Sequence, residues 1–253
     1  MQIFTMLRAV TLSQARTHNY AGLMSIFSVA PPTLSASTVF TLGHSTHAIS
    51  DLLALLARHE ISAIADVRSS PYSRMSPQYN RESFKATLNE VGIAYVFLGD
   101  ELGARSRDPR CYEQGKVQYD RLARTEAFQR GLQRVRHGAA RYRLALMCVE
   151  KEPLDCHRTI LVARHLDVLG IDVQHIVVSC VQDSALESHR NAIVRLKQRL
   201  KLTEDLFASA AELTAAAYAM QGGTMAYERA PQLRVRSGQS SQSGESDELD
   251  ESS

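Results

Sequence analysis

Residues 142–158 read YRLALMCVEKEPLDCHR, and this stretch decides the fold class. Its first half, Tyr142–Val149, is a nearly continuous apolar run, as expected for a strand that is buried on both faces of a parallel sheet. A polar segment follows, and residues His157–Leu169 then have the pattern of a helix that ends at Gly170. A strand, a polar loop and a helix in this order predict a βαβ unit.

The same alternation of strand and helix patterns continues on both sides of this unit. Short apolar runs predict the strands, and apolar residues three or four positions apart predict the helices. The predicted strands are 38–42, 61–67, 93–98, 142–149 and 173–178, and the predicted helices are 49–59, 82–91, 117–135, 157–169, 184–200 and 203–220. These elements predict an α/β domain with a mostly parallel five-stranded sheet, helices on both faces and a C-terminal helical extension.

Composition divides the chain into three segments. Residues 1–37 lack a compact apolar stretch with a cleavage site, which predicts a poorly structured extension and no secretory signal. Residues 38–220 form the predicted domain, whose helical extension occupies 183–220. Residues 228–253 are rich in Ser, Gln, Gly and acidic residues, so we expect a disordered acidic tail. Met24 is an alternative start of the protein.

The composition argues against two classes of protein. No apolar run reaches the roughly 18 residues that a helix needs to cross a bilayer, so we expect no membrane partner. Four cysteines in 253 residues are too few for a disulfide scaffold, so we expect reduced thiols and a cytoplasmic location. Without the five acidic residues between positions 239 and 253, 29 basic residues stand against 22 acidic ones. This mildly basic balance permits a phosphate-bearing partner without requiring one.

Polar residues gather where the predicted strands end. In a parallel sheet the carboxyl ends of the strands share one edge, and ligands bind there. The sequence therefore predicts one functional site, built from side chains that are far apart along the chain. The candidate residues are His44, Ser45, Asp66, Arg68, Arg74, Cys148, Glu150, Cys156, His157 and Arg158.

Two of the cysteines are candidate nucleophiles. Cys156 stands where a helix is predicted to begin, and there the helix dipole and the charge of Arg158 favour a thiolate. Cys148 ends an apolar strand, and its alternative role is to pack as a small buried hydrophobic residue. The candidate proton donors and acceptors are His44, Glu150 and Asp66, for each of which a structural hydrogen bond or ion pair is the alternative.

The candidate anion-binding groups belong to Arg68, Arg74, Arg158, Ser45 and His157. A guanidinium group can hold a phosphate or carboxylate through two parallel hydrogen bonds. The alternative for the arginines is a surface position or, for Arg68, an internal pair with a neighbouring acid. The loop 69–73 contains no glycine, so it is not one of the known glycine-rich phosphate loops.

Two cysteines and one histidine within ten residues also raise the question of zinc. The spacing of Cys148, Cys156 and His157 does not match the paired-cysteine pattern of common zinc sites. We therefore predict no metal and no cofactor, and we expect a small anionic ligand or a nucleic acid as the partner.

Several separated motifs occur in a fixed order along the chain. The motifs are Thr41–Ser45, Asp66–Arg68 with Pro71 and Ser73–Arg74, Leu98–Gly99, Cys148–Glu150 with Pro153, Cys156–Arg158, and His175–Ile176. This order resembles the bacterial family called domain of unknown function 488, over a core from Thr38 to Val178. The resemblance implies a compact α/β domain in a cytoplasmic bacterial protein, and it implies no established reaction. All ten candidate residues and Pro71 match the family's motifs, whereas the helical extension and the tail lie outside the resemblance.

Two functions are compatible with these residues. The first is an enzyme that acts on a small anionic or phosphate-bearing substrate, such as a nucleotide, a nucleic acid or a phosphorylated metabolite, with a cysteine as a possible nucleophile. The second is a non-catalytic module that binds a nucleotide or nucleic acid and in which the cysteines are structural. A metal-stabilised interaction protein is the least favoured alternative.

Overall fold

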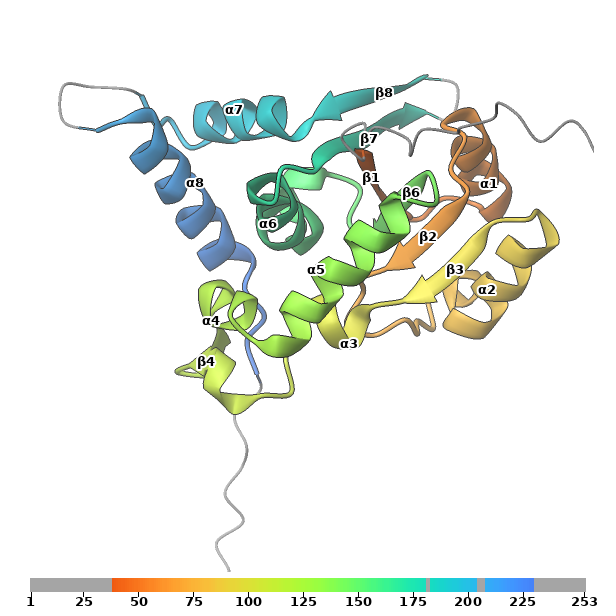
Figure 1. Cartoon of the computed structure of the whole chain (residues 1–253), viewed down its shortest axis with the longest axis horizontal. Helices are drawn as coiled ribbons and strands as arrows, with labels where there is room; N and C mark the ends of the chain where they lie inside the picture. Colours follow the sequence, from red (N-terminus) through yellow and green to blue (C-terminus); the bar gives the residue numbers. More distant parts are fainter. Residues whose placement is uncertain (1–37, 181–182, 204–207, 230–253) are drawn as a thin grey trace, which may run out of the picture. The chain divides into compact units, whose positions relative to one another are not determined.

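The protein is described here by a computed structural model of residues 38–180, 183–203 and 208–229 (Figure 1). The expectations for the N-terminal extension 1–37 and for most of the acidic tail lie outside these residues. Within the described ranges, no helix is both long and apolar enough to cross a membrane.

A six-stranded sheet forms the centre of the described chain. Its strand order is β3-β2-β6-β1-β7-β8, and every neighbouring pair is parallel except β7 and β8. The strands are β1 Thr38–Gly43, β2 Ala63–Asp66, β3 Ala94–Phe97, β6 Leu144–Cys148, β7 Asp172–Cys180 and β8 Asp183–Ser188. The predicted α/β class with a mostly parallel sheet is confirmed, and the predicted number of five strands is wrong.

The additional strand is β8, which pairs antiparallel with β7 at the edge of the sheet. Residues 184–188 were expected to begin a helix, but the helix α7 spans only His189–Arg199. The Ser188 side chain accepts a hydrogen bond from the Asn191 N–H and so caps α7 at the point where β8 ends. A strand at the edge of a sheet is stabilised by its partner, so local sequence preferences predict it poorly.

Eight α-helices are present in the described ranges. They are α1 Ile49–Arg58, α2 Arg81–Glu90, α3 Gly99–Leu102, α4 Tyr119–Ala123, α5 Glu126–Ala139, α6 Arg164–Val168, α7 and α8 Ala210–Met225. Shorter elements are the 3₁₀ turns η1 Pro77–Tyr79, η2 Pro109–Cys111 and η3 Pro153–Asp155, and the antiparallel pair β4 Tyr112–Glu113 and β5 Lys116–Val117.

Three predicted helices have different limits in the structure. The helix expected at 117–135 is divided into α4 and α5, because Thr125 is extended and caps α5 through the Phe128 N–H. The helix expected at 157–169 is a π-helical segment, η4 Arg158–Ala163, followed by α6. The last helix begins after a capping box at Ser209 and runs beyond the expected end to Met225.

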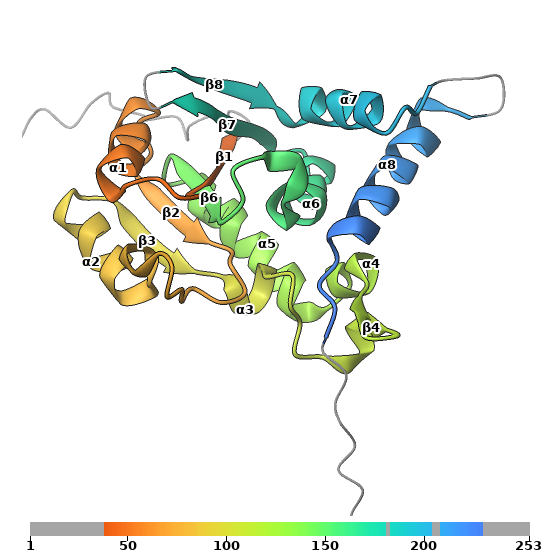
Figure 2. The same cartoon turned by 180° about the vertical axis from the view of Figure 1, so that it is seen from behind.

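Helices cover both faces of the sheet, as the sequence predicts. On one face α1 and α2 pack against the sheet, and the buried core there includes Phe40, Leu42 and Leu52 (Figure 2). On the other face α3, α5 and η4 cover a core that includes Val39 and Phe128 (Figure 1). Successive residues of β1 thus point to opposite cores, because side chains alternate along a strand.

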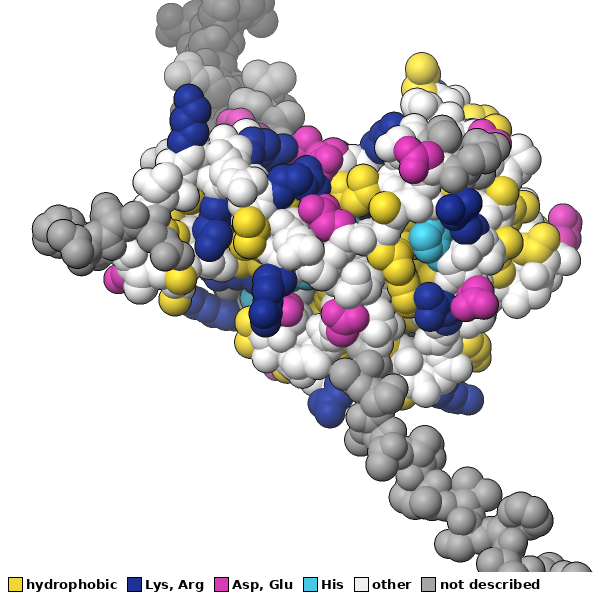
Figure 3. All heavy atoms as spheres, turned by 90° about the horizontal axis from the view of Figure 1, so that it is seen from above, with side chains coloured by type: hydrophobic (Ala, Val, Ile, Leu, Met, Phe, Trp, Pro, Cys, Tyr) yellow, Lys and Arg dark blue, Asp and Glu magenta, His cyan; other side chains and the backbone are white. Residues whose placement is uncertain are grey.

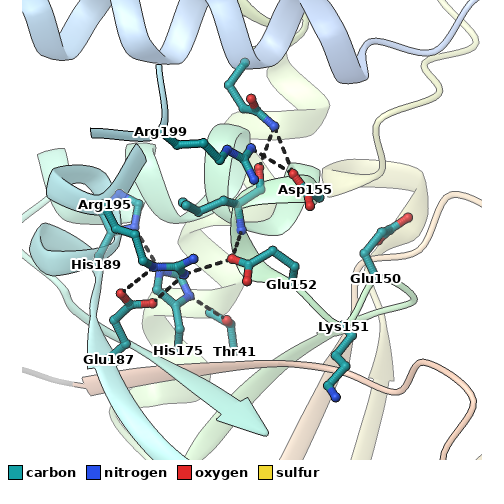
Figure 4. A network of polar contacts seen from close by, with 12 residues as sticks. Thr41, Glu150, Lys151, Glu152, Asp155, His175, Glu187, His189, Arg195 and Arg199 are labelled. Atoms are coloured by element: carbon teal, nitrogen blue, oxygen red, sulfur yellow. Dashed lines mark hydrogen bonds and ion pairs between the residues drawn. The ribbon is translucent and has the colours of Figure 1, made fainter. Parts of the chain in front are cut away.

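A chain of buried polar side chains fastens the C-terminal helices to the sheet. Thr41 Oγ1 lies 2.7 Å from His175 Nδ1, and His175 Nε2 lies 3.1 Å from His189 Nδ1 (Figure 4). His189 Nε2 lies 2.8 Å from the Tyr218 hydroxyl. Of the two nitrogens that face each other between the rings, one must donate and the other must accept, so the two imidazoles cannot both be doubly protonated. His175, a strand histidine expected in the core, is therefore a structural residue.

The first prediction concerns the pH dependence of stability that this chain creates. Burial lowers the pKa of His189 to about 4 from an ordinary 6.5, and burial together with the nearby His189 holds the pKa of His175 well below its ordinary value. The unfolded chain therefore takes up these protons first as the pH falls, and stability is lost progressively below pH 6.5. We expect His189 alone to remove about 2 kcal/mol of the unfolding free energy between pH 7 and pH 5.

Urea unfolding at pH 7 and pH 5 measures this loss. The variant His189→Gln should lose less stability than the wild type over the same interval, whereas His137→Gln, at an exposed histidine, should behave as the wild type does. Equal losses in the wild type and His189→Gln would contradict the assignment.

The close approach of β1 to the loop after β6 requires a glycine. A Cβ atom at Gly43 would overlap the carbonyl oxygen of Glu150, which is backbone and cannot move aside without displacing the loop. Two hydrogen bonds continue this approach beyond the strands, from the His44 N–H to the Cys148 carbonyl and from the Ser45 N–H to the Val149 carbonyl. Gly43 therefore determines where the loop that follows β6 lies.

The second prediction tests this contact. We expect Gly43→Ala to lower the unfolding free energy by roughly 2 kcal/mol or more, because the added methyl group overpacks a rigid contact. Gly223→Ala is the control, since a Cβ at Gly223 meets nothing within 4 Å and alanine favours the helix. In denaturant titrations, the changes in unfolding free energy of the two variants should differ in sign or by well over 1 kcal/mol. Small changes of similar size in both variants would show that the contact at Gly43 does not require a glycine.

Candidate functional site

A cavity of about 640 Å³ lies at the carboxyl ends of β1, β2 and β6. It is the region where the parallel sheet was expected to present its functional side chains. Six of the predicted site residues border it, namely His44, Ser45, Arg68, Cys148, Glu150 and His157.

A buried ion pair lies directly after β2, where Arg68 borders the cavity. Arg68 donates from Nε to Asp66 Oδ1 at 2.9 Å and from Nη2 to Asp66 Oδ2 at 2.6 Å. Its Nη2 also donates to the Tyr79 carbonyl, and the Tyr95 hydroxyl donates to the same carboxylate oxygen, Asp66 Oδ2. The Arg68 charge is therefore paired internally, which was the structural alternative for this residue. Only Nη1 of the guanidinium is directed to another site residue.

His44 receives that Nη1 group. Its Nε2 lies 3.4 Å from Arg68 Nη1, its Nδ1 lies 2.9 Å from the Ser45 carbonyl oxygen, and its ring stacks on Tyr79 at 4.1 Å between centroids. These partners assign the proton to Nδ1 and leave Nε2 as an acceptor. Burial and the Arg68 charge lower the pKa of His44 to about 4, so this imidazole is neutral at neutral pH and a weak base.

Four side chains form a compact group beside His44, which we call the thiol cluster: Cys148, Glu150, Cys156 and His157. The Cys148 thiol donates to Glu150 Oε2 at 3.1 Å, and the Cys156 thiol donates to the same oxygen at 2.9 Å. His157 Nδ1 lies 3.7 Å from the Cys148 sulfur and 3.9 Å from the Cys156 sulfur. Cys148 and Cys156 are only 3 % and 1 % exposed, and of the two sulfur-bearing residues only Cys148 borders the cavity.

The orientation of His157 follows from its second nitrogen. Its Nε2 lies 3.0 Å from the Val67 carbonyl oxygen, which can only accept a hydrogen bond, so Nε2 carries the proton. The Nδ1 lone pair therefore faces both sulfur atoms. Although burial opposes it, interaction with Cys156 raises the pKa of His157 above its ordinary value.

Arg158 supports the cluster from behind. Its side chain is fully buried, with Nη1 donating to the Glu150 carbonyl at 2.6 Å and Nη2 donating to the Lys151 carbonyl at 3.2 Å. Its backbone N–H donates to the Cys156 sulfur at 3.5 Å. No carboxylate in the described part of the chain pairs with this guanidinium, so a buried positive charge stands beside the two thiols.

This charge makes the two thiols unequal. Burial opposes ionisation of Cys156, but a hydrogen bond from Cys148, the Arg158 charge and His157 together hold the pKa of Cys156 well below its usual range. The bond to Cys156 and burial raise the pKa of Cys148 well above its usual range. Burial and the neighbouring Cys156 also raise the pKa of Glu150. The surroundings therefore favour the ionised form of Cys156 and disfavour that of Cys148.

Two arginines expected in the site do not border the cavity. Arg158 was expected to bind an anion, but its position in the π-helical turn directs the guanidinium inward to backbone carbonyls. Arg74 lies exposed in the loop before η1 and does not border the cavity. Sequence spacing does not predict side-chain direction in such irregular segments, which explains both differences. Asp66 lies behind Arg68 and is completely buried.

Other cavity residues were not anticipated from the sequence. Lys151 follows Glu150, and the two side chains point in opposite directions from the loop (Figure 4). Arg105 lies after α3 and stacks on Tyr227, which follows α8. Lys151 directly follows the Cys148–Glu150 motif, so its position in the sequence could have indicated it as a site residue. Nothing in the sequence connects Arg105 with position 227.

Comparison with known proteins identifies a family for part of the chain. Residues 48–165 match the model of a family described as "Domain of unknown function DUF488". The match includes Asp66, Arg68 and the whole thiol cluster, and it begins after His44 and Ser45, so it is shorter than the resemblance that the sequence motifs suggested. No curated protein and no solved structure matches the chain. Residues 48–165 thus match the DUF488 family of domains, which is the family that the motifs of the chain predicted.

Proposed function

We propose that this protein is an enzyme that transforms a small anionic substrate in the cavity at the carboxyl ends of the strands. One observation carries the proposal: the thiol cluster, a set of closely coupled ionisable groups, borders a cavity that also presents cations without acidic partners. Clusters of this kind, with pKa values displaced in opposite directions, are typical of catalytic sites. The proposal retains the substrate class expected from the sequence.

The cations are Lys151 and Arg105. Both border the cavity, both are exposed, and neither forms an ion pair within the described ranges. Hydroxyl groups of the loop 69–76 line the same space and can donate hydrogen bonds to an oxyanion. An anion in the cavity would therefore meet charge and hydrogen-bond donors that the protein itself leaves available.

The reactive centre in this proposal is the thiol cluster. Cys148 borders the cavity directly, and Glu150 accepts hydrogen bonds from both thiols and also borders the cavity, where it can take up or release a proton. His44 is neutral and holds the Arg68 guanidinium in place. Direct attack on a substrate by a thiol would fall to Cys148, since Cys156 lies behind the cavity wall.

A small substrate suits this site better than a long nucleic acid. On the one face seen in Figure 3, which views the molecule from above, basic side chains are mixed with acidic ones and there is no large area of one sign. Nucleic-acid binding depends on neutralising many phosphates at once, and it needs such an area. The cavity instead offers a few charges at one place.

The third prediction concerns binding. A thermal-shift screen with inorganic phosphate, pyrophosphate and a nucleoside monophosphate should raise the melting temperature, because a ligand bound only by the folded state stabilises it. Lys151→Ala and Arg105→Ala should each weaken the affinity for the best probe by roughly 10- to 100-fold, as expected for loss of a charge-assisted hydrogen bond. Arg136→Ala, at an exposed arginine away from the cavity, is the matched control. No shift with any probe, or an equal loss in the control, would contradict the proposed anion site.

The fourth prediction separates an enzyme from a binding module. Cys148→Ala should bind the best probe of the screen within about threefold of the wild type while turnover falls at least 100-fold, since the cluster supplies chemistry rather than affinity. Cys111→Ala, a buried thiol on η2 outside the cluster, should retain turnover. Binding without any turnover by the wild type, across the screened compounds, would support the binding module instead.

A further inference from the structure

Three atoms of the thiol cluster lie close enough together to hold a metal ion. Cys148 Sγ, Cys156 Sγ and a ring nitrogen of His157 all lie within 4.8 Å of one another, and all three residues are buried. They come from the end of β6 and from the turn that leads into η4. A soft sulfur pair with one imidazole is a donor set that zinc prefers.

The backbone conformation explains how the side chains of two adjacent residues, Cys156 and His157, can face the same position. Cys156 is extended, with φ −133° and ψ 139°, whereas His157 is helical, with φ −60° and ψ −24°. The change of direction between them brings the Cys156 sulfur and the His157 ring to the same side. Common zinc motifs have a regular ligand spacing that does not include such a turn, so their spacing does not predict this arrangement.

The imidazole is held as a metal-binding histidine usually is. Its Nε2–H is occupied by the Val67 carbonyl, so the free lone pair of Nδ1 faces the sulfurs. A ligand histidine commonly donates its other N–H to a carbonyl group, which sets both the tautomer and the ring direction. The Arg158 N–H supplies a similar contact to the Cys156 sulfur.

The distances fit a tetrahedral ion. Bonds of about 2.3 Å to sulfur and 2.0 Å to nitrogen at tetrahedral angles separate the sulfur and nitrogen atoms by roughly 3.5 Å. The corresponding distances from His157 Nδ1 to the sulfurs of Cys148 and Cys156 are 3.7 and 3.9 Å. Each of these two sulfur–nitrogen distances would shorten by only a few tenths of an ångström on binding.

The charges around the three ligand atoms also suit a divalent cation. Two thiolates and the Glu150 carboxylate would be balanced by a divalent ion together with the buried guanidinium of Arg158, which has no carboxylate partner in the described part of the chain. Glu150 lies against both sulfurs and borders the cavity. A fourth position on this side is open to the cavity, as in catalytic rather than structural zinc sites.

We propose that Cys148, Cys156 and His157 bind a zinc ion with three protein ligands, and that its fourth position faces Glu150 and the cavity. Binding replaces the two thiol protons, which leave to solvent, and there is no change of oxidation state. The inference adds to the proposed function a Lewis acid that can polarise a substrate oxygen. It does not depend on the substrate, because the metal can be measured in its absence.

The fifth prediction is tested on the full chain after its metal has been removed with a chelator under reducing conditions. Reloading with zinc should give one tightly bound ion per chain by elemental analysis, and cobalt should give a thiolate-to-metal charge-transfer band. Cys148→Ser, Cys156→Ser and His157→Gln should each weaken zinc affinity more than 100-fold, beyond the 10- to 100-fold typical of lost outer-shell contacts. Cys111→Ser should bind as the wild type does.

A second measurement needs no variant and therefore does not depend on their folding. Thiol labelling of the wild type followed by peptide mass analysis should show Cys148 and Cys156 protected by zinc, with Cys111 as the internal reference. If zinc leaves their labelling rates unchanged and cobalt gives no charge-transfer band, the metal site is overturned. That result would leave the anion site standing and assign the chemistry to a free Cys148 thiol, whereas failure of the anion screen would leave the metal measurement unaffected.

Discussion

The position of β6 between β2 and β1 is the constraint on which the rest of the site depends. Parallel pairing places Gly43 opposite Cys148 on one side and Asp66 opposite Met147 on the other. The ladder continues past the strands, since the Val67 N–H donates to the Met147 carbonyl. Segments separated by up to a hundred residues are thereby held in register to within one residue. The thiol cluster, the His44 ring and the Asp66–Arg68 pair meet because three strands end at one level.

The two buried arginines, Arg68 and Arg158, differ in whether a carboxylate neutralises their charge. Arg68 is neutralised by Asp66 and serves as a rigid donor toward His44. Arg158 has only carbonyl oxygens and a sulfur as partners, and its Nε has none in the described part of the chain. An uncompensated buried charge is costly, and it favours any nearby group that can become an anion. The Cys156 thiol is that group, so the polarity of the cluster follows from the placement of one guanidinium.

The loop between β6 and η4 is held by ion pairs from α7 as well as by the hydrogen bonds from Arg158. Arg195 of α7 pairs with Glu152 of this loop and with Glu187 of β8, and Arg199 pairs with Asp155 (Figure 4). The C-terminal segment after Val178, which lay outside the resemblance to the family, thus helps to position the family's own motif. It also contributes Tyr227 to the cavity. The site is therefore completed by parts of the chain beyond residues 48–165.

The sequence by itself determined the α/β class, five of the six strands to within two residues of their limits, and the edge of the sheet where the candidate site lies. These features follow from local patterns, because continuous apolar runs such as 144–148 are buried wherever they fold. Only the tertiary structure decided that 183–188 is a strand, that Arg158 faces inward, and that Arg105 and Tyr227 meet at the cavity. Strand pairing and side-chain direction depend on partners distant in the sequence, and a pattern of neighbouring residues contains no information about them.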